Sequence, residues 1–231
     1  MRSILETSLA LVLVFLFWDA LFLYPLKLLV VFLHESSHAL MTVITGGEVL
    51  ELVIDQNQGG YVSALGGNRF LVLSAGYLGS ILWGAVIVIL ASYSRQDKIL
   101  MGILGSIICL ITLIYGKGLF VFLFGIGLGM AMIASAIYVN EAINDSILRF
   151  IGFVNLMYVP LDIYSDTIAR SHLRSDARML AEEFGGTTLL WGSIWIVIST
   201  LIVILTLKFV IKHQRQQQQA SRMRQNSKKS D

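Results

Sequence analysis

The feature that most constrains this chain is a series of apolar stretches, each long enough to cross the hydrocarbon core of a bilayer as a helix. Such a crossing takes about 20 residues. Only 14% of the residues are charged, against about a quarter in soluble domains. The apolar stretches lie at 5–24, 26–45, 69–92, 98–115, 118–139, 146–164 and 188–211. We therefore predict an all-α polytopic membrane protein with six or seven transmembrane helices.

The count of six or seven depends on the amino-terminal part of the chain. Leu9 to Leu23 is interrupted only by Asp19 and follows Arg2, but no small-x-small cleavage site is present, so we expect a retained span or signal anchor. The next segment follows Pro25 and could be a full span or a re-entrant one. The orientation of the amino terminus and the identity of the membrane stay open.

A short β-hairpin is predicted between the second and third apolar stretches. Val49 to Ala64 contains two β-prone runs around a polar turn that holds Asp55 and two glycines. Asp is common in such turns because its side chain bonds to the local backbone. The hairpin could be purely structural, or its exposed edge could receive an extended substrate as a further strand.

The carboxyl-terminal segment differs in composition from everything before it. Residues 212–231 are rich in Gln, Ser, Lys and Arg and contain too few apolar residues to form a core, so we predict a membrane-embedded domain at 1–211 and a disordered tail at 212–231. Basic residues directly after a span set topology and contact anionic lipid. We therefore expect the lipid bilayer, and no nucleic acid, as a partner. The sequence carries no indication of oligomeric state.

The motif His34-Glu35-Ser36-Ser37-His38 is the strongest indication of chemistry. Histidines four residues apart lie on one face of a helix, where they can share a zinc ion, and Glu35 beside them can act as a general base. Each ionisable group inside an apolar span costs about 2–3 kcal/mol or more, which favours function over chance. We predict Zn²⁺ ligands at His34 and His38 and a catalytic base at Glu35. The alternative is a buried polar packing network.

A catalytic zinc usually has three protein ligands, and with a single cysteine in the chain the third is expected to be a carboxylate or histidine. Asp162 is the leading candidate because it follows the apolar stretch Ile151–Leu161 and lies two residues after Pro160, which interrupts helical hydrogen bonding. Asp166, four residues later, could be an alternative ligand or could support one.

Structural roles are expected for several other polar or small residues. Asp176 is predicted to cap the helix that follows it. His172 and His213 lie in charged, solvated stretches and are poor zinc candidates. Gly76 and Gly79 are predicted to let two membrane helices approach closely.

Two separated motifs resemble those of the M50 peptidases, the site-2 protease class of intramembrane zinc metalloproteases, and more narrowly their M50B-like branch. They are HESSH in an apolar helix and the segment Asn155–Asp162 (NLMYVPLD), in which Ile163 follows where glycine is usual. The resemblance implies that Asp162 is the third zinc ligand and that Asn155 helps to hold the substrate. It also implies a membrane-protein substrate.

We therefore predict a zinc-dependent endopeptidase that hydrolyses a peptide bond in or near a membrane segment of a protein substrate. The alternative is a non-proteolytic metal-binding membrane protein, such as a degenerate family member, a scaffold or a metal transporter. Glu35 distinguishes them, since Glu35→Gln abolishes hydrolysis in a protease and only perturbs transport in a transporter.

Overall fold

The computed structural model describes residues 17, 20–94, 96–171 and 173–230. The predicted span at 5–24 lies mostly outside these residues, and its last part forms the short 3-10 turn Leu21–Leu23. The helices that follow are α2 (Tyr24–Ile44), α3 (Arg69–Tyr93), α4 (Asp97–Tyr115), α5 (Leu119–Tyr138), α6 (Glu141–Tyr164), α7 (Asp176–Phe184) and α8 (Thr188–Ser230). Six helices in this part of the chain are long and apolar enough to cross a membrane, which confirms the predicted fold class.

The hairpin predicted between the first two of these helices is present. Strand β1 (Glu48–Ile54) pairs with β2 (Gly60–Leu65) in antiparallel register, with an irregularity after Val49. The Asp55 carboxylate accepts hydrogen bonds from the amides of Asn57 (2.6 Å) and Gly59 (3.3 Å), as expected for a turn residue.

The two edges of the hairpin differ. On the outer edge of β1, the Leu52 carbonyl accepts a hydrogen bond from the Lys117 amide at 2.9 Å. This bond joins β1 to the connection between α4 and α5. No strand in the described part of the chain pairs with the outer edge of β2. Within the described residues, one edge of the sheet therefore has no partner strand.

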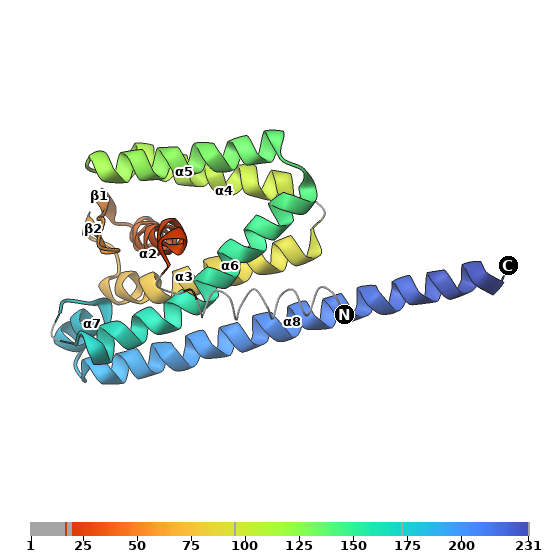
Figure 1. Ribbon diagram of the computed structural model, residues 1–231. Coiled ribbons are helices and arrows are strands. Elements are labelled where there is room, and N and C mark those ends of the chain that lie inside the picture. Colours follow the sequence, from red (N-terminus) through yellow and green to blue (C-terminus); the bar gives the residue numbers. More distant parts are fainter. Residues whose placement is uncertain (1–16, 18–19, 95, 172, 231) are drawn as a thin grey trace.

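Helix α3 lies at the centre of the fold and packs against α2, α6 and α8. Figure 1 looks nearly along α2, whereas α4, α5 and α8 are seen from the side, so α2 crosses them steeply. Where α2 packs against α3, a methyl group on Gly79 would lie 2.3 Å from the Ser37 hydroxyl oxygen, which confirms that a glycine permits the close approach of two helices.

Helix α8 continues through the segment for which disorder was predicted. It begins at Thr188, ends at Ser230 and extends past the other helices (Figure 1). The segment is helical because Gln, Arg, Lys, Met and Ala, which dominate it, are good helix formers even without a core to pack against. The division between a membrane domain and a tail stays a prediction.

Candidate active site

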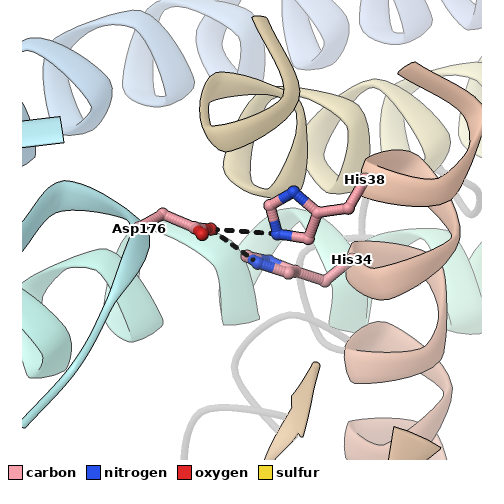
Figure 2. Close-up of side chains that lie close together, drawn as sticks. All are labelled: His34, His38 and Asp176. Carbon is pink, nitrogen blue, oxygen red and sulfur yellow. Dashed lines mark hydrogen bonds and ion pairs between the residues drawn. The ribbon is translucent and has the colours of Figure 1, made fainter. Parts of the chain in front are cut away.

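The HESSH motif lies in the middle of α2, with His34 ten residues from each end of the helix. The rings of His34 and His38 are one turn apart, with centroids separated by 4.8 Å. Both Nε2 atoms point at one carboxylate oxygen, Asp176 Oδ2, at 3.0 Å from His34 and 3.1 Å from His38 (Figure 2). Among the described residues, these three form the one group of potential metal ligands whose atoms all lie within 4.8 Å of one another.

Asp176 is the member of this group that the sequence interpretation did not place there. It is the first residue of α7, and the preceding Ser175 caps the helix by accepting a hydrogen bond from the Arg178 amide. The prediction that Asp176 is the cap is therefore wrong. Serine and aspartate are about equally good N-caps, and with Ser175 in that position the Asp176 carboxylate is free to point outward to the histidines.

The charge of Asp176 suits a metal ligand. Its side chain is buried, and burial alone would raise the pKa of the carboxyl group. The charge of His38, together with hydrogen bonds from both histidines, instead holds the pKa well below its ordinary value. Asp176 is therefore an anionic carboxylate that faces two imidazole nitrogens.

His38 is oriented by the backbone of α3. Its Nδ1 atom lies 2.7 Å from the Val72 carbonyl oxygen, and a carbonyl can only accept, so Nδ1 carries the proton. Here Nε2 also carries a proton, which it donates to Asp176, and loss of that proton would leave the Nε2 lone pair free for a metal ion. A backbone partner of this kind is common for metal-ligating histidines.

A glycine of α3 keeps space open in front of both histidines. A methyl group on Gly76 would lie 2.3 Å from His34 Nε2 and 2.5 Å from His38 Nε2. Two imidazole nitrogens and one carboxylate oxygen are a ligand set that zinc takes in catalytic sites. The residues present therefore fit a divalent metal ion.

Glu35 lies beside the histidines and against the hairpin. It is buried, and a methyl group on Gly60 of β2 would lie 2.7 Å from Glu35 Oε1. Only a glycine at this position lets the carboxylate come so close to the strand. Glu35 is thus held between the histidine pair and strand β2.

These side chains share one pocket of about 280 Å³. It is lined by α2, α3, the carboxyl-terminal end of α6, α7 and the region of the hairpin from Gln58 to Ala64. Its acidic, basic and histidine residues are His34, Glu35, His38, Arg69, Asp162, Asp166, Arg170, Arg174 and Asp176.

Asp162 and Asp166 lie in this pocket but outside the histidine group. The Asp162 carboxylate is 3.8 Å from the Arg170 guanidinium, and α6 runs through Pro160 without ending there. Asp166 accepts a hydrogen bond from the Tyr77 hydroxyl and another from Arg170, each at 3.0 Å. The structure therefore brings Asp176 to the histidine pair in the position for which Asp162 was expected.

Asn155 lies outside the pocket. It is fully buried where α6 packs against α3, and both polar atoms of its side chain lack a hydrogen-bond partner among the described residues. Its assignment to substrate binding stays a prediction that its position does not favour. His172 lies outside the described residues, and His213 stacks on Tyr93 at the other end of α3.

Comparison with known protein families identifies the family to which this chain belongs. The model of the family described as Peptidase M50B-like matches residues 7–206, most of the chain. Searches of curated proteins and of solved structures found no match. With its six candidate spans and its cluster of histidine and aspartate ligands, the chain is an integral multi-pass membrane protein that belongs to the Peptidase M50B-like family of metallopeptidases.

Proposed function

We propose that this protein is a zinc-dependent endopeptidase that hydrolyses a peptide bond in or near a membrane segment of a protein substrate. The observation that carries the proposal is the convergence of His34, His38 and Asp176 on one point of a pocket that also contains Glu35. The three ligand atoms come from α2 and α7, two helices that are far apart in the chain. A polar packing network would not require atoms from such distant segments to meet at one point.

The proposed ligands are His34, His38 and Asp176. Three protein ligands leave a fourth position for water or substrate, as catalytic zinc sites do. A bound zinc ion would lower the pKa of water towards about 7 and polarise the carbonyl of the scissile bond. Asp162 is the competing third ligand, supported by the motif, whereas distance supports Asp176.

Glu35 is the proposed general base. It directly follows the first ligand in α2, and its carboxylate lines the same pocket. From there it would accept a proton from the attacking water and deliver it to the amine that leaves. Its burial removes competing solvent from this proton transfer.

Strand β2 is the proposed site of substrate alignment. Its outer edge has no partner strand among the described residues, and Gly60, Tyr61 and Val62 line the pocket. An extended substrate segment could pair with this edge through main-chain hydrogen bonds. Since Gly60 lies against Glu35, a peptide bond held there would lie next to the catalytic base.

The test compares wild type with Glu35→Gln, Asp176→Ala and Asp162→Ala, each purified in liposomes that contain a model transmembrane substrate. We expect wild type to hold about one zinc ion per chain and to cleave. Glu35→Gln should keep its zinc and lose at least about 100-fold in rate, because it lacks a base. Asp176→Ala should lose zinc, and Asp162→Ala should keep it.

The matched control is Glu141→Gln, an exposed position at the start of α6 and at the other end of that helix from the pocket. It should keep both zinc and cleavage. A wild-type protein without zinc would refute the proposal, and zinc without cleavage of any substrate would favour a non-proteolytic metal-binding protein. Loss of zinc from Asp162→Ala alone would make Asp162 the third ligand.

A further inference from the structure

The two histidines of the site are oriented by different means. His38 is fixed by the Val72 carbonyl, but Nδ1 of His34 makes no hydrogen bond with any described residue. The His34 ring instead packs edge-on against Tyr77, with centroids 5.2 Å apart and an interplanar angle of 81°. This is a favourable geometry for two rings, and Tyr77 limits rotation of His34 together with the His38 ring and the Asp176 carboxylate.

Tyr77 is itself held by a chain of charged hydrogen bonds. Its side chain is 1% exposed, and its hydroxyl donates to Asp166 Oδ2 at 3.0 Å. The other oxygen, Asp166 Oδ1, accepts from Arg170 Nη2 at 3.0 Å. Both oxygens of Asp166 therefore have hydrogen-bond partners, which fix this carboxylate between Tyr77 and Arg170.

The backbone that presents Asp166 and Arg170 is irregular. Residues Ser165–Ala169 form a wide π turn after α6, and the Arg170 amide donates to the Ser165 carbonyl five residues back at 2.7 Å. The Arg170 side chain also bonds to the Ser165 hydroxyl at 2.9 Å. Such turns change the direction of the side chains that follow and occur often at functional sites.

We propose that Tyr77, Asp166 and Arg170 form a positioning relay that sets the orientation of the His34 ring for metal binding. The inference rests on the proposed function, because it takes His34 as a metal ligand. The relay restricts the His34 ring by packing, whereas the Val72 carbonyl orients His38 by a hydrogen bond. Arg170 is half-exposed at the pocket, so the relay also connects a ligand of the metal to the surface that a substrate would contact.

Tyr77→Phe tests the relay most directly, because it removes the hydroxyl and keeps the ring. We expect its zinc affinity, measured by competition with a chelator, to fall about 10-fold, the lower end of what loss of an outer partner costs a metal site. The visible spectrum of the Co²⁺-loaded protein should also change, since it reports ligand geometry. The control Tyr93→Phe lies on the same helix and should match wild type in both measurements.

A double-mutant cycle distinguishes a relay from two independent effects. Asp166→Asn should lower the zinc affinity by a similar factor. The double variant Tyr77→Phe/Asp166→Asn should bind zinc as tightly as the single variant that has the lower zinc affinity. Thermal unfolding of the metal-free proteins shows whether each variant is folded. If Tyr77→Phe or Asp166→Asn does not fold, Arg170→Lys is used in its place.

Wild-type zinc affinity and Co²⁺ spectrum in both Tyr77→Phe and Asp166→Asn would overturn the relay and leave the proposed function intact. Additive losses in the double variant would also overturn it. A wild-type protein that binds neither Zn²⁺ nor Co²⁺ would refute the relay and the proposed function together.

Discussion

The helices that carry the candidate site and the α4–α5 pair differ in how much of their surface is buried and in how many ionisable residues they contain. Helix α2 is less apolar than α5, yet 72% of its apolar stretch is buried inside the protein, against 22% for α5. Helix α5 contains no Asp, Glu, Lys, Arg or His at all. The ionisable side chains of the site are thus surrounded by other helices, and α5, which has none, is a helix that lipid can cover.

Small residues serve different purposes in the two regions. Between α4 and α5, a methyl group on Gly129 would lie 2.7 Å from the Gly105 carbonyl oxygen and 2.4 Å from the Cys109 sulfur, so glycine there permits contact of two backbones. On α3, Gly76 faces two imidazole nitrogens instead. Glycine in one region brings helices together, and in the other it leaves room for chemistry.

Gly76→Ala should give the largest effect. The atoms that a methyl group would meet are the ends of two histidine side chains, which can rotate away, so the fold should survive while the ligands turn from the metal. We expect zinc affinity to fall by about 100-fold or more. Gly127→Ala on α5, where nothing lies within 4 Å, is the control. Equal zinc affinity in the two variants would contradict the distinction between the regions.

Gly129→Ala should have the opposite profile. The methyl group meets backbone that cannot rotate away, so overpacking should lower stability by about 1–3 kcal/mol while zinc content stays at the wild-type level. Thermal unfolding in a single detergent and metal analysis of the same samples measure both quantities. If zinc falls along with stability, the α4–α5 pair and the site are coupled, and the comparison needs revision.

The smallest effect is expected at the ion pair between α3 and α7. Arg69 Nε donates to both carboxylate oxygens of Glu183 at 3.0 and 3.1 Å, but both side chains are exposed. Arg69→Ala should therefore cost no more than about 1 kcal/mol in unfolding free energy. A larger loss, or loss of zinc, would show that this pair holds α7 and its Asp176 in place.

What the sequence could predict depended on whether the relevant contact was local. Patterns that repeat over a few residues were enough to predict the helices and the hairpin with Asp55 in its turn. The same is true of the helix face that His34 and His38 share. Asp176 could not be found this way, because it lies 142 residues from His34 and reaches it only through the packing of α7. Ser175 was the one local signal, since a serine cap leaves the next residue free.

The motif reading of Asp162 illustrates the same limit. Asp162 follows Pro160 and lines the pocket, and its role as the third ligand stays a prediction. Which of the two carboxylates lies against the histidines depends on how α6 and α7 pack against α2. The spacing of residues within α6 does not determine that packing. The helical tail shows a second limit, because composition describes the lack of a core and not the helical preference of each residue.

The separation of the ligands along the chain also sets an order of events during synthesis. Chains grow at about 5–20 residues per second from the amino terminus. Both histidines and Glu35 are made early, but Asp176 follows only after α3, α4, α5 and α6. A growing or truncated chain thus carries two ligands and the base without the third ligand. If the proposed site is correct, proteolytic capacity begins only when α7 docks against α3, so an incomplete product cannot cut its neighbours.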